Sequence, residues 1–282
     1  MTTLIEERIG VFEAGKYNGI SNEAYHGANG VSRSDLYNFS CKSPWHYLYG
    51  KHEDKPAFDF GTAVHYAVLQ PEEFNENVVM GPDARRGTKE WSSFEQDNQG
   101  KIIMKPDDFT AVLQARKAVM AHPIASRLFY HIDRQVEVSY WWHEKITGTL
   151  CKCRPDLILP SLGWVVDLKT TRAGGGKHEN FQKDLYAYRY FVQAAFYLDG
   201  SAAIENAEMN KFFFVVVEKE EPYLVSMFEV EPAAIEYGRK VYVEDLFRLN
   251  EFEKQENPNL GYPTEILPIG LPEWAMNRLE SY

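Results

Sequence analysis

Two carboxylates and a lysine are spaced so that they could act together on a phosphodiester. Asp156 follows Pro155, and Asp167-Leu168-Lys169 begins eleven residues later, on the next predicted strand after a tight turn. Side chains alternate along a strand, so Asp167 and Lys169 share a face, and strand pairing can bring Asp156 beside them. The carboxylates are hard ligands for Mg²⁺, and the lysine can orient or help to deprotonate an attacking water. The spacing therefore predicts a phosphodiesterase site, although a hairpin with a surface ion pair would contain the same residues.

Four further polar residues accompany these motifs. Glu137 lies on the preceding predicted strand, and His65 lies near the middle of an otherwise apolar predicted helix. Gln193 and Tyr197 are four residues apart on a long predicted helix and therefore share one of its faces. A histidine among apolar residues is more often a core residue than a ligand, and a Gln/Tyr pair is more often packing. Their occurrence together, in this order, favours an active site.

The elements that must position these residues follow the order helices, three strands, helix, two strands, helix. Periodicity and helix-breaking residues predict helices within 21–60, from Gly61 to Pro71, and over 106–121, 181–200 and 232–250, with an exposed loop containing a helical piece at 81–105. Alternating patterns predict strands over 135–144, 149–160 and 164–171, forming a meander, and over 211–220 and 223–231. This order fits a single α/β domain with an elaborated helical N-terminal part.

The composition is that of an ordinary globular protein that stays in the cytoplasm. The 282 residues are 44% hydrophobic, the segment MTTLIEERIG does not resemble a signal peptide, and no apolar run approaches the roughly 18 residues of a membrane span. The net charge of −11 argues mildly against a protein that coats nucleic acid, although a nuclease must gather carboxylates to hold cations. Cys41, Cys151 and Cys153 are too few for the usual four thiolates, so we expect no iron–sulfur cluster and no disulfide framework.

Five segments spread along the chain carry a resemblance to a known family. They are GVSRSDLYNFSCKSPWHYLYG, GTAVHYAVLQPEEF, GTLCKCRPDLILPSLGWVVDLKTT, YRYFVQAAFYLDG and LPEWA. These segments resemble the RecE-like exonucleases, within the wider RecB-like group of PD-(D/E)xK nucleases. The pattern of that group is a helix histidine, a strand glutamate, PD, (D/E)xK and a helix with Q and Y. It matches His65, Glu137, Asp156, Asp167, Lys169, Gln193 and Tyr197.

The resemblance implies a fold and a reaction. The implied fold is α/β, with a PD-(D/E)xK restriction-endonuclease-like core, in which helices flank a central mixed sheet, and a helical N-terminal elaboration. One exonuclease domain, 1–282, would comprise a mainly helical part at 1–130, the nuclease core at 131–255 and a C-terminal extension at 256–282. The implied activity is 5′ to 3′ degradation of one strand of linear double-stranded DNA from its ends, with Mg²⁺ or, as a substitute, Mn²⁺. It would release 5′-phosphomononucleotides and leave 3′ single-stranded tails. A homo-oligomeric ring, a RecT-like single-strand annealing partner and a phage or prophage source are also implied.

The resemblance and the chemistry of the side chains together suggest metal ligands. Asp156 and Asp167 are expected to be the principal ligands, with a ring nitrogen of His65 as a further one. The family also suggests the carbonyl oxygen of Leu168. Glu137 is expected to act on the metal through a water molecule.

The remaining residues of the pattern are assigned to the reaction and to DNA. Lys169 is expected to position the attacking water and to offset its developing charge, with Gln193 and Tyr197 supporting the lysine and the scissile phosphate. Candidate DNA contacts are Arg33, Arg85, Arg86, Arg172 and Lys177, each of which could equally be a solvated surface cation.

Three other functions remain open at the level of sequence. The motif alone does not encode polarity or a need for DNA ends, so a structure-selective or restriction-like endonuclease of the same superfamily is an alternative. A non-catalytic DNA-binding protein on a degenerate nuclease fold is disfavoured because every chemical position keeps a competent residue. A small-molecule metallohydrolase would need a denser cluster of His and Asp and ranks last.

Overall fold

The computed structural model describes residues 10–50, 56–271 and 276. The first nine residues, the predicted C-terminal extension beyond residue 271 except Met276, and all of the LPEWA motif except Leu271 lie outside the described residues. Within the described ranges, no helix combines the length and the apolar character that crossing a membrane requires.

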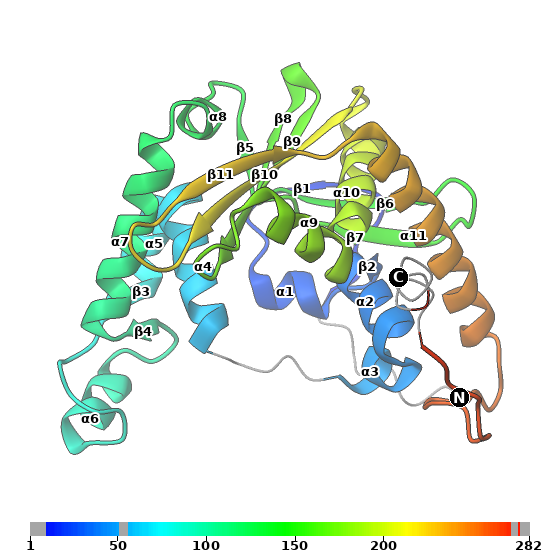
Figure 1. Cartoon of the computed structure of the whole chain (residues 1–282), viewed down its shortest axis with the longest axis horizontal. Helices are drawn as coiled ribbons and strands as arrows, with labels where there is room; N and C mark the ends of the chain where they lie inside the picture. The colour runs from blue at the N-terminus through cyan, green and yellow to red at the C-terminus, as the bar shows by residue number, and fades with distance from the viewer. Residues whose placement is uncertain (1–9, 51–55, 272–275, 277–282) are drawn as a thin grey trace.

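A five-stranded mixed sheet forms the centre of the fold (Figure 1). Its strands are, in order, β11 (Val225–Glu229), β10 (Lys211–Glu218), β9 (Trp164–Thr171), β8 (Leu157–Leu159) and β5 (Gln135–Val136). β9 and β10 are parallel, whereas the other neighbours are antiparallel. The helices α9 (His178–Ala187) and α10 (Tyr190–Glu205) form the crossover that parallel strands need. The predicted α/β class, with a mixed sheet flanked by helices, is confirmed.

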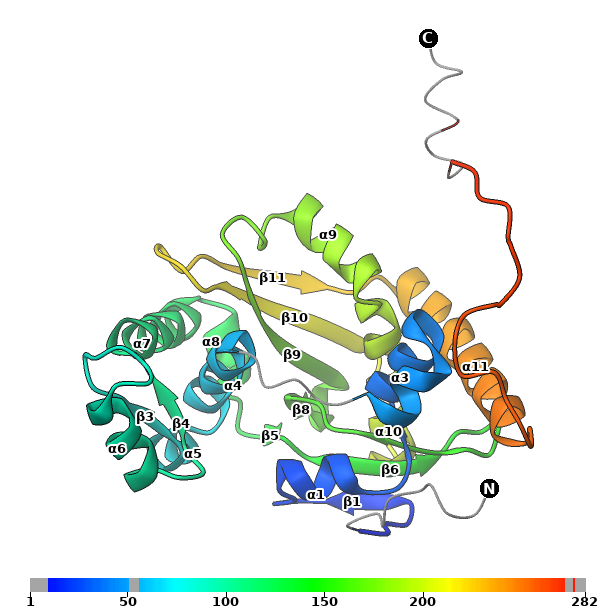
Figure 2. The ribbon, with the colours of Figure 1, turned by 90° about the horizontal axis from the view of Figure 1, so that it is seen from below.

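Helices cover both faces of this sheet (Figure 2), and packing against them gives each face its own hydrophobic core. One core joins buried strand residues such as Leu168 to the helices α4 (Pro56–Leu69), α7 (Pro106–Ala121) and α8 (Ala125–Phe129). The other joins residues such as Val165 to α9, α10 and α11 (Pro232–Glu253). Because side chains alternate along β9, Leu168 points towards α4, while Asp167 and Lys169 point towards α10.

A second sheet is joined to the first by two chain segments, each of which bends and continues from one sheet into the other. Its strands are, in order, β1 (Gly15–Tyr17), β6 (Ser139–His143), β7 (Leu150–Cys153) and β2 (Val31–Ser32). The predicted meander of three long strands is therefore wrong in its first two members, since 135–144 divides into β5 and β6, and 149–160 into β7 and β8.

The two bends have local causes and lie together. Glu137, expected on a strand, instead occupies the first bend with a positive φ of 52°. At the second bend Pro155 has no N–H to offer to a strand ladder. The N–H of Glu137 donates to the carbonyl of Asp156 at 3.1 Å, so the bends are joined to each other.

The helix predicted over 181–200 is also divided. α9 ends at Ala187, Arg189 adopts a left-handed conformation with φ 53°, and α10 starts at Tyr190 and continues past Gly200 to Glu205. Gly200 therefore does not end the helix. A Cβ atom there would lie 2.6 Å from the ring of Trp142, so this glycine lets α10 lie directly against the second sheet.

Apart from α4 and α7, the elements of the N-terminal half are short. Where the sequence predicts two short helices, the chain forms α1 (Asn22–Gly27), α2 (Arg33–Tyr37), a π-helical turn (Asn38–Lys42) and α3 (Pro44–Tyr49). Ser32 caps α2 through a reciprocal capping box with Asp35. Beyond α4 come α5 (Pro71–Asn77), β3 (Val78–Met80), α6 (Lys89–Asp97) and β4 (Ile102–Met104). The helical piece predicted within 81–105 and the helix predicted over 106–121 are confirmed as α6 and α7.

Candidate active site

The two motif aspartates lie side by side on neighbouring strands. Leu157 of β8 pairs with Val166 of β9 in antiparallel register, which brings the preceding Asp156 next to Asp167. Oδ2 of Asp156 accepts a hydrogen bond from the backbone N–H of Leu168 at 2.6 Å. Both aspartates are buried. The strand pairing inferred from the spacing of the motifs is therefore present.

A possible metal-binding group forms where α4 meets the two bends. One ligand atom each from His65, Glu137 and Asp156 lies within 4.8 Å of the others. Nδ1 of His65 lies 3.5 Å from Oδ2 of Asp156. The helix neighbours Ala63, Val64, Ala67 and Val68 are in the hydrophobic core, whereas His65 is only half-buried. His65 thus lies on the side of α4 that faces the carboxylates, and Glu137 is as close to this group as a direct ligand would be.

Asp167 and Lys169 form a contact of their own on the α10 face of the sheet. Nζ of Lys169 lies 2.5 Å from Oδ1 of Asp167, and 4.8 Å from the centre of the Tyr190 ring. Nε2 of Gln193 donates to the other oxygen, Oδ2, at 2.5 Å. Despite its contact with the lysine, Oδ1 has no hydrogen bond of suitable angle to any described residue. Asp167 is thus oriented by Gln193 and retains an oxygen that a cation could bind.

Tyr197 and Arg33 lie at the edge of this arrangement. Tyr197 follows Gln193 by one turn of α10, and burial together with the charge of Asp167 raises the pKa of its hydroxyl well above the usual value. The guanidinium of Arg33 donates to the carbonyl of Tyr188 and lies 6.0 Å from the centre of the Tyr190 ring. Burial lowers the pKa of Arg33, and the charge of Asp167 opposes that effect. Both residues therefore belong to the electrostatic surroundings of Asp167.

The other predicted DNA contacts are dispersed. Arg172, on the loop after β9, is 3.6 Å from Asp184, and Lys177 is exposed at the start of α9. Arg85 and Arg86 belong to the segment between β3 and α6, two elements at the periphery of the molecule in Figure 1. The guanidinium of Arg86 donates to the carbonyl of Ile103 at 3.2 Å. Of the five, Arg33 lies near Tyr190, and Arg172 lines the same cavity as Lys169.

Three carboxylates, those of Glu137, Asp156 and Asp167, crowd together at the site. Burial and the charge of Asp156 raise the pKa of Glu137 to about 8. Burial, reinforced by Asp156 and opposed by Lys169, raises the pKa of Asp167 to about 6. Burial lowers the pKa of His65, but the adjacent Asp156 outweighs it and raises that pKa to about 9. A divalent cation among these groups would relieve the repulsion, so the donor set fits a hard metal ion.

Two cavities give access to the site from different sides. The metal-side cavity, of about 820 Å³, is lined by His65 and Glu137 together with residues of the loop before α1. The lysine-side cavity, of about 190 Å³, is lined by Lys169 together with residues of α9 and the start of α10. Thr170 and Lys219 line both cavities. Sequence reasoning missed Lys219 because it follows a buried strand and belongs to no motif.

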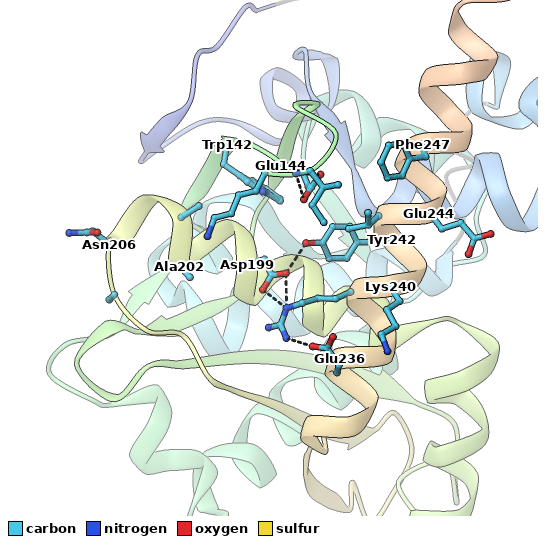
Figure 3. A pocket seen from close by; sticks show the side chains of 16 residues that line it. Trp142, Glu144, Asp199, Ala202, Asn206, Glu236, Lys240, Tyr242, Glu244 and Phe247 are labelled. Carbon is cyan, nitrogen blue, oxygen red and sulfur yellow. Dashed lines mark hydrogen bonds and ion pairs between the residues drawn. The ribbon is translucent and has the colours of Figure 1, made fainter.

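A larger cavity, of about 920 Å³, lies elsewhere, between α10, α11 and the turn after β6 (Figure 3). Its Asp199 carboxylate is 2.9 Å from Nε of Arg239 and accepts a hydrogen bond from the Tyr242 hydroxyl at 2.7 Å. The charges of Asp199 and Arg239 thus offset each other, and the described residues form no metal-binding group there. The possible metal-binding group lies at the sheet site, although that site has the smaller cavities.

Known proteins share this pattern and architecture. A family model described as "PDDEXK-like domain of unknown function (DUF3799)" matches residues 40–261. A crystal structure from Eubacterium rectale, of a protein named provisionally as an exonuclease, has a TM-score of 0.54 at 14% sequence identity, covering 88% of this chain and 92% of that chain. This likeness shows the fold. A crystal structure named SSO0001 is 18% identical, covers 68% of this chain and 85% of its own, and has a TM-score of only 0.32. No curated protein matches the chain.

Proposed function

Because the chain belongs to the PDDEXK-like family DUF3799, we propose that it is a metal-dependent exodeoxyribonuclease that degrades one strand of linear double-stranded DNA. One observation carries the proposal. The ligand atoms of His65, Glu137 and Asp156 lie within 4.8 Å of one another, directly beside the Asp167–Lys169 pair. A hard-ligand group next to an ammonium is what hydrolysis of a phosphodiester requires.

One group of residues would bind the metal ion, and another would position the reacting groups. His65, Glu137, Asp156 and Asp167 would hold Mg²⁺, or Mn²⁺ in its place, and the carbonyl of Leu168 is a further proposed ligand. When bound, the cation supplies Lewis-acid stabilisation of the charge that develops on the phosphoryl group. Glu137 is proposed here as a direct ligand rather than one that acts through water, because one of its carboxylate oxygens lies within 4.8 Å of ligand atoms of both His65 and Asp156.

Lys169, Gln193 and Tyr197 serve the reacting groups. The Lys169 ammonium, fixed by Asp167 at 2.5 Å, orients the attacking water and offsets negative charge as the water adds to phosphorus. Gln193 holds Asp167 in the orientation that keeps this lysine in place. Tyr197 supports the scissile phosphate. The bond from phosphorus to the 3′ oxygen breaks, so the released mononucleotide carries the 5′ phosphate.

Polarity and partners rest on the resemblance to RecE-like exonucleases. The proposal is digestion from 5′ to 3′ that leaves 3′ single-stranded tails, by a ring of identical subunits. A RecT-like annealing protein would then coat the tails. The predicted domain division and the cytoplasmic location remain predictions.

Linear DNA labelled separately at its 5′ and 3′ ends tests the proposal, with covalently closed circular DNA as the companion substrate. We expect Mg²⁺-dependent loss of the 5′ label as mononucleotide, and an intact circle. Nicking or linearisation of the circle would instead identify an endonuclease of the same superfamily. DNA binding without cleavage in Mg²⁺ or Mn²⁺ would identify a non-catalytic binding protein.

A further inference from the structure

The groups needed for chemistry open into two different cavities. His65 and Glu137 line the metal-side cavity, whereas Lys169 lines the lysine-side cavity. A substrate that reaches both the metal-binding group and the lysine must therefore extend across the place where the cavities meet. That place is marked by Thr170 and Lys219, which line both.

The backbone fixes Lys219 at this junction. It directly follows β10, and its N–H donates to the carbonyl of Thr171 at 2.9 Å, which extends the parallel pairing of β9 and β10 by one residue. From there its side chain reaches towards α4, where Nζ lies 5.7 Å from the centre of the Phe60 ring. α4 itself passes close to the strand, since a Cβ atom on Gly61 would lie 3.5 Å from Oγ1 of Thr170. The ammonium thus lies between the helix that carries His65 and the strand that carries Lys169.

The charge of Lys219 has no counterpart in the part of the chain that the structure describes. No carboxylate there lies within ion-pair distance, and its neighbour Glu218 is turned away to accept a hydrogen bond from the N–H of Gly174 at 2.8 Å. Burial lowers the pKa of Lys219, which means that its ammonium has lost part of its hydration without gaining an anion. Such a group is suited to an anion that arrives from outside.

Arg154 provides the contrast, although it lines the metal-side cavity too. Its Nε donates to Ser139 at 2.8 Å, one terminal nitrogen donates to Asn22 at 2.8 Å, and the other donates to the carbonyl of Ile20 at 2.9 Å. Its Cζ atom also lies 4.3 Å from the centre of the Tyr25 ring. Arg154 therefore holds the loop before α1 in place, and each of its three nitrogens already donates a hydrogen bond.

We propose that Lys219 binds a backbone phosphate of the DNA strand at the junction of the two cavities, next to the phosphate that is cleaved. This inference rests on the proposed function. In this role Lys219 is a positioning residue: it holds the strand so that one phosphodiester meets the metal-binding group and Lys169 together. Its three N–H donors suit a phosphate as a point charge.

Salt-dependent DNA binding of Lys219→Met tests the inference, because methionine keeps the apolar stem beside Phe60. Binding of a fluorescein-labelled linear duplex is measured by anisotropy with Ca²⁺ in place of Mg²⁺, over about 50 to 200 mM KCl. We expect affinity to fall roughly tenfold, as for one charge-assisted hydrogen bond. The slope of log K against log [KCl] should become shallower by about 0.7 to 0.9, the contribution of one phosphate contact. Ca²⁺ affinity and melting temperature should stay at parental values.

Two further variants complete the experiment. Lys219→Arg keeps the charge and should restore the slope. Lys211→Met removes a cation from the opposite end of the same strand, where Lys211 pairs with Glu229 at 3.0 Å, and should leave the slope unchanged. The inference is wrong if Lys219→Met has the parental slope, or if Lys211→Met reproduces its effect. If the parent protein neither binds nor cuts linear DNA, the proposed function itself is wrong. If the parent cuts DNA but Lys219→Met changes neither the affinity nor the salt slope, only this inference is wrong.

Discussion

The side chain of Asp156 accepts a hydrogen bond from the backbone N–H of Leu168, with 2.6 Å between Oδ2 and N. Both residues are buried, and the bond joins the bend before β8 to the middle of β9. The orientation of the carboxylate is thereby set by the sheet itself, before any cation binds. Two substitutions of Asp156 separate its charge from this hydrogen bond: asparagine removes the charge alone, and alanine removes both.

Asp156→Asn should fold normally but bind Mg²⁺ at least about tenfold more weakly and lose cleavage, because the amide keeps an acceptor oxygen but carries no charge. Asp156→Ala should also lower the free energy of unfolding by about 1 to 3 kcal/mol, because it leaves the Leu168 N–H buried without an acceptor. Calorimetric Mg²⁺ titrations and thermal unfolding in EDTA measure the two effects. Equal Mg²⁺ affinity in Asp156→Asn and the parent, or an active Asp167→Ala, would contradict the assignment of these ligands.

Lys169→Met should reduce the cleavage rate by about 10²- to 10³-fold, because the ammonium is needed when charge develops in the transition state. Affinity for duplex DNA in Ca²⁺ should stay close to that of the parent. Single-turnover cleavage in Mg²⁺ and anisotropy in Ca²⁺ provide the two readouts. A parallel loss of affinity and rate would show that Lys169 is mainly a phosphate anchor.

His65→Ala should bind Mg²⁺ weakly and cleave little, because the side chain faces the carboxylates rather than the core. In EDTA its melting temperature should fall only by the loss of the ion pair between the protonated imidazole and Asp156. Val64→Ala is the matched control. Val64 is fully buried, so its truncation should cost about 1 to 3 kcal/mol of stability without altering Mg²⁺ affinity. If the Mg²⁺ titrations of His65→Ala and the parent coincide, His65 is not a ligand.

Mg²⁺ binding should release protons near neutral pH. The pKa of His65 is about 9 and that of Glu137 about 8 in the metal-free protein, so both groups hold protons at about pH 7. A ligand must lose its proton to bind metal, so affinity should increase as pH rises from about 7 to 9 and decrease at lower pH. Calorimetry in Hepes and in Tris, which differ in ionisation enthalpy and bind Mg²⁺ only weakly, measures the release. Identical heats in the two buffers would show that neither group is deprotonated on binding.

The spacing of residues was sufficient to predict the centre of the site but not its surroundings. Asp156, Asp167 and Lys169 could be placed together because strand alternation and a short turn are local rules. The bend at Glu137 and the break at Arg189 could not, since a positive φ is unfavourable for both residue types and persists only through tertiary contacts. For Arg189 one such contact is the 2.8 Å ion pair with Asp245 of α11. No sequence motif pointed to Lys219, because its proposed role depends on its position between two cavities that exist only in the folded protein.

The residues around the metal-binding group are contributed from widely separated positions along the chain. His65 comes from α4, Glu137 and Asp156 from two bends, and Gln193 from α10, within the crossover that follows β9. β10 must then pair with β9 before Lys219 reaches its position. During synthesis on the ribosome, domains fold as units and distant pairings form late. A nascent chain should therefore remain unable to cut nucleic acid until its C-terminal third has been made, so the enzyme becomes active only after translation of most of its length.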